Sequence, residues 1–376
     1  MSAPESLICW QEDDQPRQAL WRSIAGVQAP AKVALADDRM SADVAYKLAC
    51  EGTALLWRGD YHQARHLVQA LARRLDRKGP GKPAATPQAA FHQHRQRQAQ
   101  RARVLGLVLL PFEADHTVPL RRAPDVKEAC EAVWGPGTVP YVASLRELLG
   151  LIGANEWRKS GVDIPAVGGR IHAHHGVFSP VRGEYVDLVA QAPLPADRSL
   201  AFDIGVGSGV LSAVLARRGV ARVIGTDQDL RALACAQENL DRLGLIAQVQ
   251  LQQLDLFPSG QAPLVVCNPP WLPGKPSAPI EYAIYDPDSR MLKGFLKGLR
   301  EHLSPGGEGW LILSDLAEHL GLRTREELLG WVQQAGLQVL GRLDARPRHP
   351  KANDANDPLH QARAAEVTSL WRLGAA

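Results

Sequence analysis

One turn restricts the possible folds of this chain more than any other feature. The run Ala201–Ile204 is apolar except for Asp203, and three glycines follow it at alternate positions, Gly205, Gly207 and Gly209. Glycines let the backbone turn tightly and approach a ligand closely. From residue 210 onward, apolar side chains are spaced to lie on one face of a helix. A strand, a glycine turn and a helix in this order predict an α/β fold.

Three more strand-like runs each end in a polar side chain, namely Asp227, Asp255 and Asn268. Each run is of a length and composition typical of a strand. Parallel strands of an open sheet end at one edge, and such sheets bind their ligands there. We therefore expect these three side chains and Asp203 to line one binding site.

The last of these runs continues into Asn268-Pro269-Pro270-Trp271. Proline has no backbone N–H, so two prolines cannot continue a strand ladder and the chain must leave the sheet rigidly. An amide precedes the prolines and an indole follows them. This arrangement suits a flat, amino-bearing group such as a nucleobase or a carboxamide. The structural alternative is a rigid loop whose tryptophan belongs to the core.

Together these motifs resemble the class I S-adenosylmethionine-dependent methyltransferases of the branch with an Asn-Pro-Pro-aromatic motif. The glycine spacing differs from the Gly-x-Gly-x-x-Gly of dinucleotide-binding proteins. The resemblance implies S-adenosylmethionine as cofactor, with Asp227 at the ribose and Asp255 at the adenine amino group. It assigns cofactor binding to Asp203, Gly205, Gly207, Gly209, Asp227, Asp255, Leu256 and Asn268. It assigns catalysis to Asn268, Pro269, Pro270 and Trp271.

The resemblance extends over residues 170–373. Within it, Gly176–Pro180 is similar to the segment that precedes the cofactor fold in protein-glutamine and ribosomal-RNA guanine methyltransferases. It implies that residues 156–376 form a Rossmann-like sheet of seven strands, the last of them antiparallel. Residues 281–290 are expected to form a loop over the active site.

The resemblance also implies a mechanism. A methyl group on a sulfonium is already activated, so neither a metal nor a nucleophilic side chain is required. The acceptor nitrogen is a poor nucleophile because its lone pair is delocalised. The side-chain carbonyl of Asn268 and the main-chain carbonyl of Pro269 are placed to accept its N–H groups. Trp271 would stack on the planar group, and positioning would supply most of the rate.

The motifs leave the substrate open. We expect N-methylation of an exocyclic amino or amide nitrogen, with an RNA base, in particular of ribosomal RNA, as the leading substrate. Protein glutamine is the first alternative, because the clamp does not distinguish a carboxamide from a base. A DNA adenine is another. A non-catalytic RNA-binding module that retains the fold is a fourth.

Residues 1–155 are expected to form a mainly helical accessory domain that recognises the substrate. Apolar spacing predicts helices over 42–56, 61–75, 125–134 and 144–157, with a further helix from about Phe91. The run 104–112 is strand-like. Glycine and proline predict a flexible linker near 78–90.

Charge is uneven, although the net charge of the 376 residues is only +3. Lysines and arginines crowd residues 57–103, where Asp60 and Asp76 are the only acids. A basic surface suits phosphate backbones, which favours RNA as partner. The alternative is a solvated helix face without a partner.

The five cysteines are scattered, which predicts free thiols in an intracellular protein. The longest apolar run, 104–112, is too short to cross a membrane. The N-terminus lacks the pattern of a signal peptide, so a soluble, cytoplasmic protein is expected.

The run His172-Ala173-His174-His175 raises the question of a metal site. On a strand, His172 and His174 would share a face. No cysteine or carboxylate lies close in sequence to complete a ligand set. We therefore expect no metal here and place these residues beside the substrate entrance.

Overall fold

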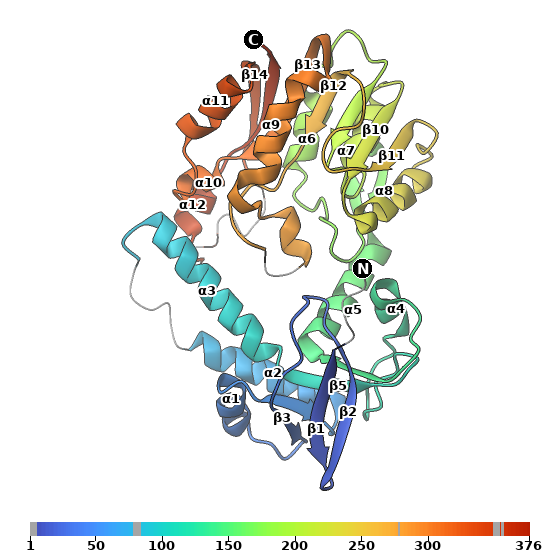
Figure 1. Ribbon diagram of the computed structural model, residues 1–376, viewed down its shortest axis with the longest axis vertical. Helices are drawn as coiled ribbons and strands as arrows, with labels where there is room; N and C mark the ends of the chain where they lie inside the picture. Colours follow the sequence, from blue (N-terminus) through green and yellow to red (C-terminus); the bar gives the residue numbers. More distant parts are fainter. Residues whose placement is uncertain (1–5, 78–83, 277–278, 349–353, 355–356) are drawn as a thin grey trace. The chain divides into compact units, whose positions relative to one another are not determined.

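The computed structural model describes residues 6–77, 84–276, 279–348, 354 and 357–376. The chain divides into two compact units. Unit 1 comprises Met1–Ala84 and His92–Glu156, and unit 2 comprises Ala85–Phe91 and Trp157–Ala376. Figure 1 shows the elements of each.

Unit 2 is built on a seven-stranded sheet. From edge to edge its strands are β11 (Val249–Gln253), β10 (Val223–Asp227), β9 (Ala201–Ile204), β12 (Ala262–Cys267), β13 (Leu303–Ser314), β15 (Thr368–Ala375) and β14 (Leu337–Ala345). The first five are parallel to one another, and β15 is antiparallel to both β13 and β14. The prediction of seven strands with the last antiparallel is confirmed.

The helices of unit 2 are α6 (Glu184–Gln191), α7 (Val210–Arg217), α8 (Leu230–Arg242), α9 (Arg290–His302), α10 (Leu316–His319), α11 (Arg325–Gln334) and α12 (His360–Ala365). Short 3₁₀ helices occupy η1 (Pro165–Val167), η2 (Pro279–Ala283) and η3 (Pro287–Ser289). A hairpin of β7 (Val162–Ile164) and β8 (Gly169–Ile171) precedes the sheet.

Successive side chains of the central strands belong to different cores. Val266 packs with residues of α6, α7 and α8, whereas Val265 packs with residues of α9 and α11. This alternation is the two-residue period of a strand. Because helices cover both faces, all six residues of β12 are buried. A strand buried on both faces must be apolar throughout, which is why its sequence shows no alternation.

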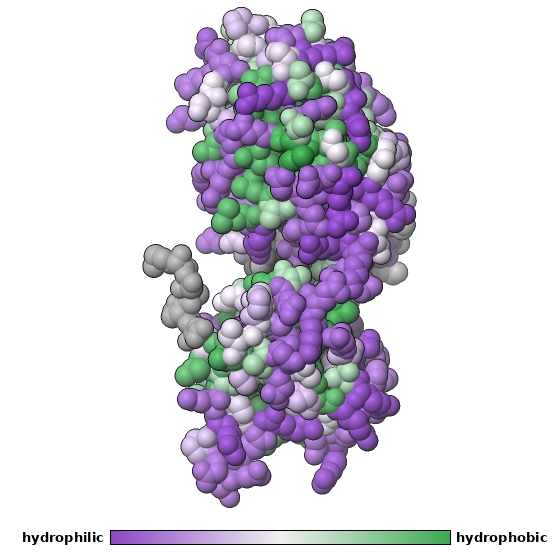
Figure 2. Space-filling view, turned by 90° about the vertical axis from the view of Figure 1, so that its right-hand side faces the viewer, coloured by the Kyte–Doolittle hydropathy of each residue, from purple (hydrophilic) through white to green (hydrophobic). Residues whose placement is uncertain are grey.

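Hydrophobic residues also reach the surface. Figure 2 shows a face that is largely hydrophilic, with hydrophobic residues in patches between the charged ones.

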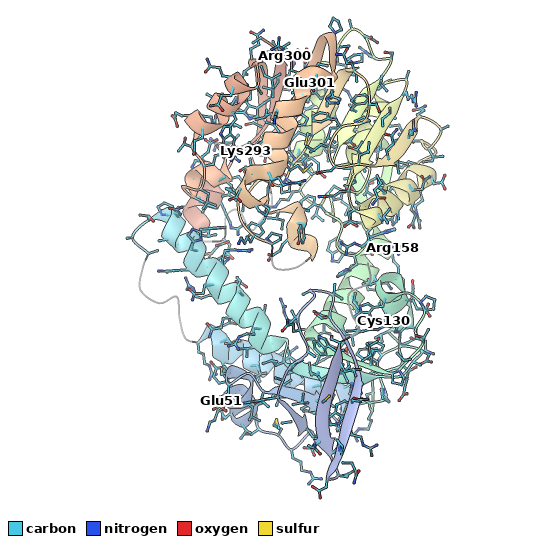
Figure 3. The ribbon with its side chains drawn as sticks, viewed as in Figure 1. Glu51, Cys130, Arg158, Lys293, Arg300 and Glu301 are labelled. Carbon is cyan, nitrogen blue, oxygen red and sulfur yellow. The ribbon has the colours of Figure 1, made fainter. Side chains whose placement is uncertain are left out.

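In α9, Lys293 lies with its Nζ 4.6 Å from the centre of the Trp331 ring of α11 (Figure 3). A cation over an aromatic face adds to the packing of the two helices.

Unit 1 is also built on a sheet. Its six strands follow the order β1 (Leu7–Glu12), β2 (Gln15–Arg22), β6 (Tyr141–Ser144), β5 (Val108–Phe112), β4 (Ala54–Trp57) and β3 (Val33–Ala36). Helices α1 (Ala42–Cys50), α2 (Tyr61–Asp76) and α4 (Lys127–Trp134) lie within unit 1, whereas α3 (Pro87–Leu105) and α5 (Leu145–Ser160) each include residues of both units. The prediction of a mainly helical domain is therefore corrected: unit 1 has an α/β architecture.

The missed strands have a physical explanation. Strands β3, β4 and β6 have four residues each and are almost wholly apolar. Periodicity cannot distinguish so short a run from part of a buried helix. The predicted helix 42–56 shows the effect. It ends at Cys50, Gly52 adopts a φ of +87°, and Ala54 begins β4.

The linker predicted near 78–90 falls partly outside the described residues. Residues 78–83 lie outside the described part of the chain, and α3 already begins at Pro87. Proline is well tolerated in the first turn of a helix, where its missing N–H has no intrahelical partner. The hydroxyl of Thr86 accepts a hydrogen bond from the backbone N–H of Ala89 at 3.1 Å and caps this end.

Within the described ranges, no helix combines the length and apolar character needed to cross a membrane.

Candidate active site

The four polar side chains predicted to meet do follow neighbouring strands. Because β11, β10, β9 and β12 are adjacent and parallel, Asp255, Asp227, Asp203 and Asn268 occur in that order along the carboxyl edge. Asp203 is still within its strand, whereas Asp255 and Asn268 lie just beyond theirs.

The glycine turn after β9 depends on conformations that other residues avoid. Gly205, Gly207 and Gly209 have φ values of +77°, +54° and +82°. The backbone N–H groups of Gly205 and Val206 both donate to the carbonyl of Thr226, at 2.9 and 2.8 Å. A side chain at any of these glycines would be strained. At Gly205 a Cβ atom would also lie 2.7 Å from Cε of Met291.

Asp203 lies beneath this turn. Its side chain is 1% exposed, and Oδ2 accepts a hydrogen bond from the hydroxyl of Ser212 at 2.6 Å. Burial raises the pKa of this carboxyl to about 6, against the opposing effect of the bond from Ser212. In this structure Asp203 therefore anchors the turn to α7. Sequence reasoning gave Ser212 no role.

Asp227 supports the turn from the next strand. Its Oδ2 accepts from the N–H of Gly207 at 3.1 Å, and its Oδ1 accepts from the N–H of Asp229 at 2.9 Å. Burial raises the pKa of Asp227, while these backbone bonds lower it. Each carboxylate oxygen can accept more than one hydrogen bond, so Asp227 retains the capacity to accept from a ribose diol.

Asp255 is exposed and forms an ion pair with Arg290, the first residue of α9. Leu256 adopts a φ of +79°, unusual for a residue with a branched side chain. Its carbonyl accepts a hydrogen bond from the Thr226 hydroxyl at 2.5 Å, which holds this conformation. The Asp255 carboxylate is already paired, so the adenine amino group expected to bind it would have to compete with Arg290.

The Asn-Pro-Pro-Trp turn contains a hydrogen bond that the sequence did not reveal. Nε1 of Trp271 donates to Oδ1 of Asn268 at 2.9 Å. Trp271 is partly buried and packs against the cores on both faces of the sheet, and Pro269 is buried. The indole thus fixes the direction of the Asn268 amide. Because a carbonyl oxygen has two lone pairs, Oδ1 can accept a second hydrogen bond.

The segment after this turn is tied back to the start of α9. The N–H of Asp286 donates to the carbonyl of Leu272 at 2.9 Å. The Asp286 carboxylate accepts from the N–H groups of Met291 and Leu292, at 3.0 and 3.1 Å. Asp288 and Ser289 between them have φ values of +55° and +54°. The segment 281–290, expected to be a loop, thus contains parts of η2 and η3 and the capped start of α9. The sequence did not indicate that Asp286 caps this helix.

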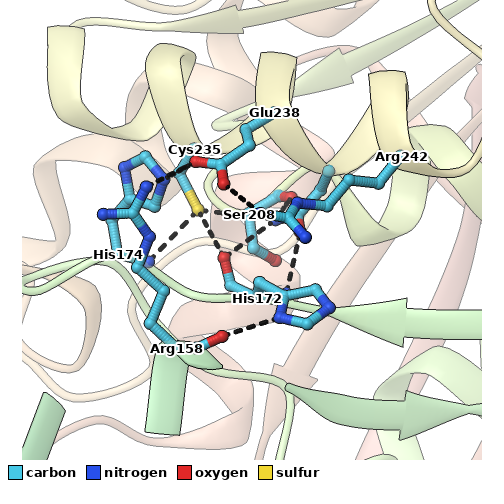
Figure 4. A network of polar contacts seen from close by, with 8 residues as sticks. Arg158, His172, His174, Ser208, Cys235, Glu238 and Arg242 are labelled. Carbon is cyan, nitrogen blue, oxygen red and sulfur yellow. Dashed lines mark hydrogen bonds and ion pairs between the residues drawn. The ribbon is translucent and has the colours of Figure 1, made fainter. Parts of the chain in front are cut away.

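A second group that sequence reasoning missed is centred on Asn239 of α8, which is 1% exposed. Its Nδ2 donates to the carbonyl of Ser208 in the glycine turn at 3.0 Å and to that of His172 at 3.3 Å. Its Oδ1 accepts from the N–H of His172 at 2.8 Å (Figure 4). One buried amide therefore joins the glycine turn to the segment that follows β8.

The neighbouring Glu238 collects three donors. Its carboxylate accepts from Arg158 at 2.7 Å, from Nε2 of His174 at 2.6 Å and from Arg242 at 2.7 Å (Figure 4). Burial opposes ionisation, but these hydrogen bonds outweigh it and lower the pKa of Glu238 to about 2. Burial lowers the pKa of His174.

The four-residue histidine run is not a strand, since β8 ends at Ile171. His172 and His174 are instead held through their backbone and ring atoms by Arg158, Asn239 and Glu238. Over the described ranges, no three histidine, cysteine or acidic side chains are grouped to hold a metal ion.

Residues 168–335 match the methyltransferase small domain family. The matched stretch is less than half of the chain and contains the glycine turn, the strand-end acids and the Asn-Pro-Pro-Trp turn.

Curated relatives show the same similarity. The chain is 29% identical over 175 residues to a release factor glutamine methyltransferase of Cereibacter sphaeroides, covering 42% of this chain and 60% of the relative. It is 30% identical over 145 residues to a tRNA1(Val) (adenine(37)-N6)-methyltransferase of Shewanella loihica, covering 36% and 59%. It is 39% identical over 98 residues to a ribosomal RNA large subunit methyltransferase G of Vibrio cholerae, covering 24% and 26%. In each case the match spans less than two thirds of the relative.

Proposed function

We propose that this chain is an S-adenosylmethionine-dependent N-methyltransferase that acts on an exocyclic amino group of an RNA base. The observation that carries the proposal is the hydrogen bond from Trp271 to Asn268 at the end of β12, beside the glycine turn of β9. Methyl transfer to a weakly nucleophilic nitrogen requires an amide carbonyl that is already oriented beside the glycine turn.

The residues present fit the cofactor. Beside Gly207 the space is open, because an added Cβ would have only the Gly205 carbonyl oxygen within 4 Å. The first turn of α7 has Gly209 at its N-cap and no side-chain cap, so backbone N–H groups remain for a ligand. Gly205, Gly207, Gly209 and Asp227 would hold the cofactor, which supplies an activated methyl group. Asp203 acts beneath them through Ser212.

The acceptor side depends on Asn268. With one lone pair of Oδ1 occupied by Trp271, the other is free to accept an N–H from the substrate nitrogen. The Pro269 carbonyl would accept the second N–H. Both bonds orient the nitrogen lone pair toward the methyl carbon, a preorganisation that costs nothing at the moment of reaction. The bound cofactor would supply the methyl group, and the acceptor nitrogen would release its proton to solvent.

An RNA substrate is supported by two observations. Relatives over the methyltransferase domain include enzymes whose names specify tRNA adenine and ribosomal RNA. In unit 1, the stretch 57–103 places Arg65, Arg73 and Arg77 on the exposed surface of α2 and at its end. Part of its charge is neutralised, since Arg74 pairs with Asp43 and Arg101 pairs with Asp76.

Protein glutamine is the second candidate. One relative is a release factor glutamine methyltransferase, and a carboxamide presents the same planar N–H groups to Asn268 as a base amine does. The RNA base and the protein glutamine would use the same site residues. They differ in the polymer that carries the acceptor nitrogen.

One experiment separates them. The protein is incubated with cofactor carrying a labelled methyl group and with cell extract, and RNA, DNA and protein are then separated. Label in RNA is the expected result. Label confined to protein would replace RNA with glutamine as the substrate. Absence of cofactor binding by calorimetry would contradict the enzymatic proposal altogether and favour a binding module.

A further inference from the structure

An arginine of unit 2 is buried without a partner. Arg323 lies in the turn between α10 and α11 and is 3% exposed. Its Nε and Nη2 atoms are buried and make no hydrogen bond within the described part of the chain. A guanidinium stays charged under all ordinary conditions, so a full positive charge is removed from water here.

The nearby carboxylates are engaged elsewhere. Glu318 accepts from Nε of Arg325, with both oxygens at 2.9 Å. Glu327 closes the capping box of α11 by accepting from the N–H of Thr324 at 2.7 Å. Asp286 caps α9. These three acids moderate the electrostatic cost at Arg323, but none forms a hydrogen bond to its guanidinium within the described ranges.

The unpaired atoms of Arg323, Nε and Nη2, form the edge of a guanidinium that can bind two oxygens of one anion. Elsewhere in the described part of the chain the same two atoms, Nε and Nη2, bind both oxygens of one carboxylate, as in the pairs Arg58 with Glu12, Arg122 with Asp60, Arg231 with Asp229, and Arg372 with Glu308. This planar, two-donor geometry matches carboxylates and phosphates. Arg323 therefore presents a complete oxyanion-binding edge with no oxyanion on it.

The backbone of Arg323 lies next to the acceptor side of the site. Strand β13 pairs with β12, and α10 begins directly after it. Ala317 of α10 and Leu320, which follows this helix, pack in one cluster with Leu272, the residue after the Asn-Pro-Pro-Trp turn. The N–H of Arg323 donates to the carbonyl of Ala317 at 3.4 Å. The arginine thus belongs to the layer that supports the segment leaving Trp271.

Keeping such a charge is expensive. A buried donor without a partner costs stability, and replacing a buried charge by an apolar side chain of similar volume is often stabilising. Sites that retain a cost of this kind are commonly functional.

We propose that Arg323 binds a phosphate group of the RNA substrate and so positions the target base over Asn268. This inference rests on the proposed function. In the complex the side chains that enclose Arg323 would move apart and admit the phosphate oxygens to the Nε–Nη2 edge, which is buried in the free protein. The cost of the unpaired charge would be recovered only when substrate is bound.

The test compares Arg323→Met with Arg325→Met. Without ligand, Arg323→Met should raise the unfolding midpoint by about 2 °C or more, because it removes an unpaired buried charge. It should also raise KM for RNA about tenfold, lower the slope of log affinity against log salt by about one, and leave cofactor affinity unchanged. Arg325→Met should do the opposite: it loses its Glu318 pair and its contact with the Trp371 ring, so the midpoint falls while KM for RNA stays.

Arg323→Lys keeps the charge without the two-donor edge and should give an intermediate KM. Inorganic phosphate separates this proposal from the substrate assignment: it should raise the unfolding midpoint of the wild type more than that of Arg323→Met. If that difference holds and the methyl label goes to protein, the RNA substrate is wrong and the oxyanion site stands. If Arg323→Met lowers the midpoint, or methylates RNA with the wild-type KM, the role of Arg323 is overturned.

Discussion

Asn268 and Trp271 show how two side chains three residues apart divide one task. The sequence predicted that the amide would meet the acceptor nitrogen and that the indole would stack on it. The structure adds that the indole N–H holds the amide in one direction. The roles of both residues in transfer stay predictions, which substitutions can separate.

Asn268→Ala should bind cofactor nearly normally and transfer methyl roughly a hundredfold more slowly, a loss on the order of 3 kcal/mol in the transition state. Single-turnover rates and calorimetric cofactor affinity measure the two effects. Turnover near that of the wild type would remove Asn268 from the mechanism.

Trp271→Phe tests the orienting bond alone, because it keeps an aromatic ring and removes the indole N–H. We expect kcat to fall about tenfold, the equivalent of one hydrogen bond of about 1–1.5 kcal/mol, with cofactor affinity unchanged. Trp271→Ala is the comparison, and should lose more because the ring is also lost. Equal rates for Trp271→Phe and the wild type would mean that Asn268 needs no such partner.

The buried carboxyl of Asp203 predicts a dependence of stability on pH. Its pKa is about 6 in the folded protein and near 4 when unfolded, so the unfolded state releases its proton first as pH rises. Its contribution to stability is therefore present below about pH 4 and is lost as pH rises through 6.

Asp203→Asn removes this titration. The stability of the variant relative to the wild type should increase by roughly 2–3 kcal/mol between pH 4 and pH 6, measured by denaturant unfolding across that range. A difference that does not change with pH would contradict the raised pKa. Ser212→Ala is the matched control, since it removes the hydrogen bond and keeps the carboxyl group.

At the scale of elements, α8 is connected to the glycine turn through Asn239. Helix α8 and strand β9 are separate in sequence, and only the fold brings the Asn239 amide to the Ser208 carbonyl. Without Asn239 the residues expected to bind the cofactor would still be present, but the turn would lose the hydrogen bond to Ser208 that fixes its shape.

Asn239→Ala should weaken cofactor binding about tenfold and leave kcat at saturating cofactor nearly unchanged, because the turn can still be brought into shape by the ligand. Asn239→Asp accepts from His172 but cannot donate to Ser208, so it should behave like the alanine variant. Calorimetry and initial rates distinguish this from general destabilisation, which would lower the active fraction without changing the affinity of the remainder.

Elements of unit 2 were easier to predict than those of unit 1. Strands β9, β10 and β12 each join a buried apolar run to a polar end, so their sequence carries both the strand and its boundary. Strands β3 and β4 have four residues each, and the apolar residues of β4 continue the helical spacing of the predicted helix 42–56. Their identity depends on pairing with each other and with β5, which no local pattern records.

At the scale of the whole molecule, unit 1 offers exposed cations and unit 2 contains the site. If the stretch 57–103 contacts RNA, a double change of Arg65 and Arg73 to Gln should lower the log–log salt dependence of RNA binding by about one per lost phosphate contact, and leave cofactor affinity unchanged. Filter binding at several salt concentrations measures the slope. Arg39→Gln, an exposed residue outside this stretch, is the control. An unchanged slope would leave α2 without a role in RNA contact.

The sequence by itself indicated the glycine turn after β9, the proline turn after β12 and the polar residues at the strand ends, and its family resemblance implied the seven-stranded sheet of unit 2. The two turns could be predicted because they are local: glycines and prolines act on their own stretch of backbone. The tertiary structure decided which side chains hold the site in shape. Asp203 meets Ser212, Asn239 meets Ser208, and Arg323 is enclosed without a counter-ion. Burial and hydrogen bonding between distant residues depend on packing, which no short stretch of sequence specifies.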